Sequence, residues 1–274
     1  MDGNMPEILQ DFSKDILCEA IQRNRRALHA FGCALPGTDV RDDAEVSWCI
    51  TSLREPFFNC VYHTNIRRGH TDAIIEEAMS CARARHVGLW WFIGLDTRPA
   101  GIARNLKARG FLPNEVMGMA LDLTKINRAV CPADLKITPV TDRATLKIWC
   151  RIAVAGFATP EEIKEDWFQW YAGIGLKPDG PFRHYLGWWK GEPVATASLL
   201  LAEGVAGIYN VATLPQMRQR GIGINITCVP LENALKAGYR IAILQASKQG
   251  SPIYHKIGFQ DCCKLMSYIW EPKY

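Results

Sequence analysis

The sequence predicts an α/β fold on a mixed (α+β) sheet, divided into two halves. Helix-like and strand-like segments alternate along the 274 residues, and a polar segment that contains Pro132 interrupts them near the middle. At about 150 residues per domain, the length favours two domains. We therefore expect domains at 1–124 and 135–274, with a linker at 125–134.

In the first half, apolar residues recur at helical spacing from Ile16 onward, and Ser13 is a suitable N-cap. Branched and aromatic runs predict the strands, and Leu89–Gly94 has the composition of a fully buried one. The expected helices are Ser13–Gly32, Thr71–His86 and Pro99–Arg109, and the expected strands are Val46–Ile50, Phe57–His63, Leu89–Gly94 and Val116–Leu121.

In the second half, the turn Lys190-Gly191 joins two predicted strands. A third strand leads into a glycine loop and a long helix, which Pro230 is expected to kink. The expected strands are Leu135–Val140, His184–Trp189, Pro193–Leu201, Val205–Val211, Ile241–Gln245 and Lys264–Trp270. The expected helices are Asp142–Ala155, Glu161–Tyr171, one that runs from the end of the glycine loop to about Ala237, and Pro252–Ile257.

Composition argues against several classes of protein. The net charge is +4 without a basic tract, which does not favour nucleic-acid binding. No run approaches the ~20 apolar residues of a membrane span, and Met1–Pro6 does not resemble a signal peptide, so we expect a cytoplasmic protein without a membrane partner. The ten cysteines form no C-x-x-C pair, which predicts buried free thiols and no metal site.

The loop Arg218-Gln219-Arg220-Gly221-Ile222-Gly223 joins an expected strand to an expected helix. Its glycines allow several backbone N–H groups to point into one site, and the start of the helix adds attraction for a phosphate. The alternative is a tight turn without a ligand. No Walker run is present, and Ile226 replaces the third glycine of a dinucleotide fingerprint.

The residues around this loop resemble the central coenzyme-binding motif of the GNAT superfamily of acyl-CoA-dependent N-acyltransferases. The strand Gly207–Thr213 and Pro215 precede the R-x-x-G-x-G loop. Leu244–Ser247 and Tyr254–Phe259 resemble the following motif, in which a Tyr precedes a K-x-G-F-like turn. The resemblance covers about Leu135–Trp270 and implies a GNAT-like acyltransferase fold.

The resemblance implies acetyl-CoA as the donor, because it is the commonest donor in the family. In GNAT enzymes the strand before the loop splays from its neighbour, and its free backbone binds the pantetheine arm. Val211 N–H is expected to meet the oxyanion, and Tyr254 to protonate the departing thiolate. Packing under the sheet is the alternative role of Tyr254. The implied coenzyme-binding residues are Val211, Ala212, Thr213, Arg218, Gln219, Arg220, Gly221, Ile222, Gly223 and Ile224.

The acceptor site of the family lies near the first two helices, which here are rich in aromatic residues. We expect Trp167, Trp170 and Tyr171 to bind substrate, with core packing as the alternative at this helical spacing.

The general base is not defined by the sequence. The strand before the loop offers Tyr209 and Asn210 where many family members have a Glu. We expect a water relay or an amine that is already deprotonated on binding, with Glu162, Glu165 and Asp166 as outside candidates.

The first half echoes the same pattern, because Leu106–Phe111 aligns with Tyr254–Phe259. Leu106 replaces the tyrosine, however, and the corresponding loop Arg67–His70 lacks a second glycine. We expect tandem GNAT-like domains in which the first has lost coenzyme binding. The alternative is an unrelated α/β domain.

Three functions remain open. The leading one is an acetyl-CoA-dependent N-acetyltransferase that acts on the primary amine of a small molecule by direct attack on the thioester. The others are a non-catalytic acyl-CoA sensor or scaffold and a protein N-acetyltransferase. The expected partners are acetyl-CoA and a small amine acceptor, and the expected assembly is a monomer or a homodimer.

Overall fold

The computed structural model describes residues 7–272, which form two compact units. Among the described residues, the larger unit comprises 7–25 and Met117–Cys263, and the smaller unit comprises Arg26–Val116 and 264–272. The units therefore do not follow the chain in sequence, since each takes residues from both sides of 125–134. The domain boundaries expected from the sequence stay a prediction.

The sheet of the larger unit has the strand order β5, β10, β9, β8, β7, β6. β9 and β10 run parallel, whereas the other neighbours run antiparallel. The strands are β5 (Leu112–Asp122, the last part of which lies in this unit), β6 (Leu135–Pro139), β7 (Phe182–Trp189), β8 (Glu192–Ala202), β9 (Val205–Thr213) and β10 (Ile241–Ala246).

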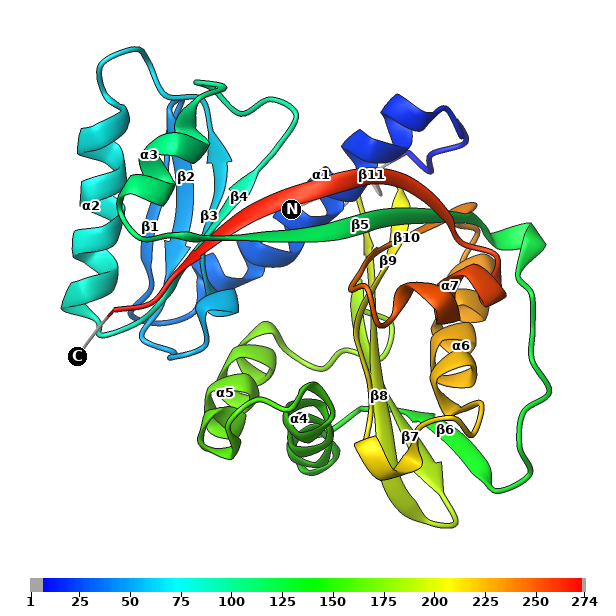
Figure 1. Cartoon of the computed structure of the whole chain (residues 1–274). Coiled ribbons are helices and arrows are strands. Elements are labelled where there is room, and N and C mark those ends of the chain that lie inside the picture. The colour runs from blue at the N-terminus through cyan, green and yellow to red at the C-terminus, as the bar shows by residue number, and fades with distance from the viewer. Residues whose placement is uncertain (1–6, 273–274) are drawn as a thin grey trace. The chain divides into compact units, whose positions relative to one another are not determined.

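Helices cover both faces of this sheet (Figure 1). α4 (Arg143–Phe157) and α5 (Lys164–Ile174) lie on one face, and α6 (Ile222–Lys236) and α7 (Ser251–Ile257) on the other. Because both faces are covered, β8 is buried without a break from Val194 to Leu201.

The short 3-10 helices of the larger unit lie at the ends of its strands and helices. They are η3 (Leu123–Lys125), η4 (Glu161–Ile163) and η5 (Pro215–Met217). α4 starts at a capping box, in which the Asp142 side chain accepts from the Thr145 backbone N–H at 2.8 Å. This cap satisfies an amide that the first turn of α4 leaves without an intrahelical partner.

The first part of α1 (Lys14–Ala30) belongs to the larger unit and is fixed there by Asn24. This fully buried side chain donates to the Ala202 carbonyl at 2.8 Å and accepts from the Tyr209 hydroxyl at 2.8 Å. Gly207 lies directly beneath it, and a Cβ at that position would overlap the Asn24 carboxamide. The glycine is therefore required by the close approach of α1 to β9.

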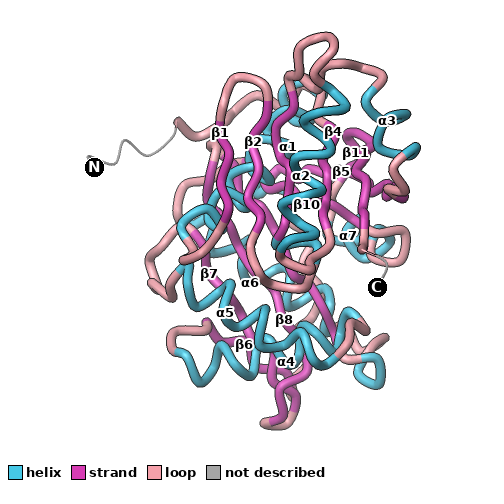
Figure 2. The backbone as a smooth tube through the Cα atoms, turned by 90° about the vertical axis from the view of Figure 1, so that its left-hand side faces the viewer, coloured by secondary structure: helices cyan, strands magenta, loops and turns pink. Residues whose placement is uncertain are grey.

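The smaller unit has a sheet of order β1, β2, β3, β4, β11, and α2 lies across it (Figure 2). Its core joins apolar residues of α2, such as Ile75, to strand residues such as Trp91. The elements are η1 (Phe31–Ala34), β1 (Asp39–Asp42), β2 (Val46–Ile50), η2 (Pro56–Phe58), β3 (Asn59–Thr64), α2 (Thr71–Ala84), β4 (Leu89–Ile93), α3 (Ile102–Ala108) and β11 (Gln260–Trp270, the last part of which lies in this unit).

Most expected elements are present, but several differ from the expectation. β1 was not expected from the sequence and forms by antiparallel pairing with β2, and β5 and β11 start earlier than expected, at Leu112 and Gln260. β3 starts at Asn59, since the residues before it form η2. α6 includes the buried Pro230 and ends at Lys236, close to the end expected from the sequence, and the kink at Pro230 stays a prediction.

All ten cysteines are free thiols, and the buried ones are Cys18, Cys49, Cys60, Cys150, Cys228 and Cys262. The prediction of buried free thiols is thus confirmed for most of them. Among residues 7–272, no helix has both the length and the apolar character needed to cross a bilayer.

The contact at Gly207 gives a test of the fold. Gly207→Ala should lower the free energy of unfolding by about 2 kcal/mol, because a Cβ at this position overlaps Asn24 and Tyr209. Gly101→Ala is the control, since a Cβ there meets nothing within 4 Å; we expect its effect to stay within about 0.5 kcal/mol. Urea unfolding measures both, and equal effects would contradict the packing described.

Candidate functional site

β9 and β10 separate at the centre of the larger unit. Their parallel pairing starts at Ala206 with Ala242 and ends at Ile208 with Leu244. β9 continues to Thr213 on its other side, where it remains paired with β8. The last residues of β9 thus have one backbone edge that β10 does not pair, and such an edge can bind an extended ligand as an added strand.

A bulge lies where the two strands part. Thr196 of β8 pairs with Ala212 and Ser198 pairs with Tyr209, so β9 has one more residue than β8 in this interval. Asn210 takes the left-handed backbone conformation, with φ of 52°. Its carbonyl accepts from the Thr196 hydroxyl at 2.9 Å, which fixes the bulge to the neighbouring strand.

A chain of buried polar side chains holds Asn210 in place. Its Nδ2 donates to the Tyr171 hydroxyl at 2.8 Å and to Ser198 Oγ at 3.1 Å. Ser198 Oγ lies 2.7 Å from His184 Nδ1. Burial lowers the pKa of His184 to about 3, so the imidazole is neutral, and a hydrogen bond joins its Nδ1 to the Ser198 hydroxyl. The network is uncharged throughout the neutral pH range.

The glycine loop follows β9 and leads into α6. Gln219 and Gly221 have φ of 63° and 75°, so two left-handed residues turn the chain immediately before the helix. Gly221 is the N-cap residue, and the backbone N–H groups of the first turn of α6 start here. These groups and the helix dipole make the start of α6 favourable for an anion.

Both arginines of the loop have partners within the larger unit. Arg218 Nη2 donates to the Gly156 carbonyl at 2.9 Å, and Arg218 Nε donates to the Thr213 carbonyl at 3.2 Å. The Arg220 guanidinium lies over the Trp189 ring, 5.9 Å from its centroid. Arg218 therefore holds the loop against the end of α4, and a direct contact of either arginine with a phosphate stays a prediction.

α7 brings Ile253 and Tyr254 to the same end of the sheet. A Cβ on Gly223 would lie 3.5 Å from Ile253 Cδ1 and 3.9 Å from Thr213 Oγ1, so the loop, β9 and α7 converge there. Tyr254 is half-buried, and its ring meets Phe259 edge to face at 6.0 Å between centroids. Burial raises the pKa of Tyr254 to about 12, which keeps the hydroxyl protonated at neutral pH.

The aromatic residues expected to bind an acceptor pack together on α4 and α5. Trp170 and Tyr171 are fully buried, and Trp167 is 5% exposed. Phe157 is 44% exposed and stacks on Trp167 at 5.9 Å between centroids. In the structure these side chains are core residues of that layer, and their contact with a substrate stays a prediction.

The outside candidates for a general base lie in η4 and in the first turn of α5. Glu162 and Glu165 are exposed, whereas Asp166 is buried. Their role as a general base stays a prediction.

Sequence reasoning noted Asn210 but missed its partner Ser198 and also His184, which bonds to Ser198. The available signal was the presence of polar residues at buried positions of two apolar strands, since such residues must form hydrogen bonds with one another.

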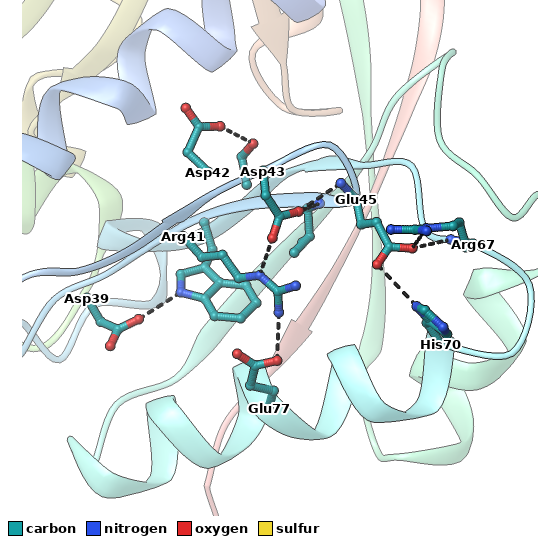
Figure 3. Close-up of polar contacts among 11 residues, drawn as sticks. Asp39, Arg41, Asp42, Asp43, Glu45, Arg67, His70 and Glu77 are labelled. Atoms are coloured by element: carbon teal, nitrogen blue, oxygen red, sulfur yellow. Dashed lines mark hydrogen bonds and ion pairs between the residues drawn. The ribbon is translucent and has the colours of Figure 1, made fainter.

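The corresponding loop of the smaller unit is filled by the protein's own carboxylates (Figure 3). Glu45 accepts from the Arg67 backbone N–H at 2.9 Å and from Arg67 Nε at 3.0 Å, and lies 3.2 Å from His70 Nδ1. The Arg67 backbone N–H and the His70 ring hold the pKa of Glu45 below its usual range. Glu45 thus remains an anion within this loop.

A second carboxylate stands at the start of α2. Asp72 is the second residue of α2, whereas Gly223 is the second residue of α6. Asp72 accepts from Asn105 and Arg109, both at 2.9 Å. An incoming phosphate would meet two like charges here, which supports the prediction that the first half has lost coenzyme binding.

Solved structures share this fold. A GCN5-related N-acetyltransferase from Kribbella flavida is 16% identical, with a TM-score of 0.63 over 92% of this chain and 96% of its own. A GCN5-related N-acetyltransferase from Sphaerobacter thermophilus is 14% identical, with a TM-score of 0.62 over 96% of this chain and 95% of its own.

A tandem GNAT protein from the clavulanic acid biosynthesis pathway is 14% identical, with a TM-score of 0.59 over 98% of this chain and 99% of its own. No family model and no curated protein sequence gives a significant match. The chain therefore has the fold of the GNAT acetyltransferases, tandem members included, and the fold expected from the sequence is confirmed.

The bulge gives a test of the site. Asn210→Gly should lower the free energy of unfolding by about 1–3 kcal/mol, because Tyr171 and Ser198 lose a buried donor. Asn210→Ala should lower the free energy of unfolding by about 1 kcal/mol more than the glycine variant does, since alanine disfavours the left-handed conformation. Glu203→Gly is the control, at an exposed turn with φ of 55°, and should not destabilise the protein. Urea unfolding measures all three; an alanine variant as stable as the glycine variant would contradict the strained bulge.

Proposed function

We propose that this chain is an N-acetyltransferase that transfers the acetyl group of acetyl-CoA to a primary amine of a small molecule. The observation that carries the proposal is the separation of β9 from β10 at the Asn210 bulge, directly before a glycine loop and the start of α6. This arrangement offers an unpaired strand edge and an anion site in succession, and acetyl-CoA has an amide-rich arm followed by a pyrophosphate.

The residues fit acetyl-CoA as follows. The backbone of Val211, Ala212 and Thr213 binds the pantetheine arm, because β10 leaves this edge unpaired. The backbone from Gln219 to Ile224 binds the pyrophosphate at the start of α6. The absence of a side chain at Gly223 supports this assignment. A side chain at this position would extend toward Ile253 and Thr213 and would occupy space beside the loop that the pyrophosphate needs.

The chemistry is direct attack of a neutral amine on the thioester carbonyl. The Val211 N–H stabilises the oxyanion, and the bulge fixes the direction of that N–H before substrate binds. Tyr254 donates a proton to the departing thiolate and is protonated throughout the working pH range. The neutral His184 and Asn210 network supplies no strong base, which favours an amine deprotonated on binding or through water.

Coenzyme binding is tested at Gly223. Gly223→Asp should weaken CoA binding at least about tenfold, because the carboxylate repels the pyrophosphate. The helix itself should remain stable, since an acidic residue in the first turn interacts favourably with the helix dipole. Gln260→Glu adds the same charge at an exposed position outside the loop and should leave the Kd unchanged. Calorimetry should also give one site per chain. Unchanged affinity in Gly223→Asp, or two equal sites, refutes the assignment of the loop.

Substitution of Tyr254 tests its proposed role as the general acid. Tyr254→Phe should lower kcat about 100-fold with little change in the Kd for CoA, because only proton transfer is lost. Tyr185→Phe, which removes a hydroxyl bonded to Asn233 and Arg183 outside the proposed site, should retain activity. For the wild type, kcat/KM should rise with pH as the amine deprotonates, and should fall only as the pH approaches the Tyr254 pKa of about 12.

The same assays separate the three functions. CoA release that depends on a small amine, and that Tyr254→Phe abolishes, supports the proposal. CoA binding without turnover across a broad panel of amines indicates an acyl-CoA sensor. Turnover with peptides alone indicates a protein N-acetyltransferase.

A further inference from the structure

Three cysteines gather in the smaller unit, outside the site described above. Cys33 lies in η1, Cys49 in β2 and Cys60 in β3. Cys49 and Cys60 are directly opposed in the antiparallel register, so their side chains share one face of the sheet. Cys33 and Cys49 lie close enough that a hydrogen bond between their thiols shifts the pKa of the two cysteines in opposite directions. Two of the three thiols are thus already in contact.

Cys33 has the environment of a reactive thiol. Its Sγ lies 3.5 Å from the Tyr62 hydroxyl, and the residue is only half-buried. Hydrogen bonds from Cys49 and Tyr62 outweigh burial and the charge of Asp42, and they lower the pKa of Cys33 to about 6. These hydrogen bonds favour the nucleophilic thiolate form of Cys33.

The other two thiols differ from Cys33 and from each other. The contact with Cys33 and burial raise the pKa of Cys49, so it holds the proton of the pair. Cys60 is committed to other partners, since its Sγ donates to the Phe57 carbonyl at 2.9 Å and lies 3.2 Å from His29 Nδ1. Cys49 is thus the thiol placed to react with an oxidised Cys33.

We propose that Cys33 and Cys49 form an oxidation-sensitive dithiol that a hydroperoxide converts to a disulfide. The Cys33 thiolate attacks one peroxide oxygen; the O–O bond breaks, a sulfenic acid forms and hydroxide leaves. The Cys49 sulfur then attacks the Cys33 sulfur, the S–O bond breaks, and the oxygen leaves as water with the Cys49 proton. With hydrogen peroxide as oxidant, the two thiols lose two electrons and the peroxide yields two water molecules.

The proposal is independent of acetyl transfer and is tested on the whole chain. The wild type is treated with a small excess of hydrogen peroxide, its free thiols are blocked under denaturing conditions, and its peptides are mapped by mass spectrometry. We expect a Cys33–Cys49 linked peptide that dithiothreitol removes. Cys33→Ser should lack the link, whereas Cys81→Ser, which removes another half-buried cysteine of the same unit, should retain it.

A second measurement does not depend on any variant being folded. In the reduced wild type at pH 7, iodoacetamide should modify Cys33 at least about ten times faster than Cys81, whose pKa burial raises to about 11. Equal rates overturn the proposal. So does a peroxide-treated protein with no disulfide, or one in which Cys33 or Cys49 is joined to Cys60.

Discussion

The left-handed backbone of Asn210 is the constraint on which the larger unit depends. Its side chain reaches Tyr171 and Ser198, and these bonds offset the strain of a positive φ in a residue with a Cβ. The extra residue bends β9 away from β10, and the free edge, the glycine loop and the start of α6 follow in order along the chain. Without the bulge, β9 and β10 could remain paired to their ends.

Charge is divided between the two ends of this region. Burial keeps His184 neutral in the network at the bulge, and it keeps the Tyr254 hydroxyl of α7 protonated, so these polar groups act as oriented dipoles. At the loop, the helix terminus and the exposed Arg218 and Arg220 provide positive potential. Such a division suits a ligand with an uncharged reactive end and an anionic tail, because neither end of the site has to be reorganised on binding.

The sequence was sufficient for the elements and the loop because both depend on local chemistry. Glycines at 221 and 223 and the apolar strand before them define the turn and the helix that follows. The partners of Asn210 could not be predicted in the same way. His184 and Ser198 lie on other strands, and only the register of β7, β8 and β9 brings them together. The contacts of Trp170 and Tyr171 likewise depend on how α5 packs, so helical spacing alone left their role open.

Glu45 has a further consequence for the smaller unit. A carboxylate held on the same chain acts as a ligand at an effective concentration on the order of millimolar or higher, set by the intervening backbone. Arg67 and His70 are therefore saturated by an internal ligand before any solute arrives. An external anion must displace this carboxylate before it can bind. The Glu45 side chain therefore competes with any external anion for the loop of the smaller unit.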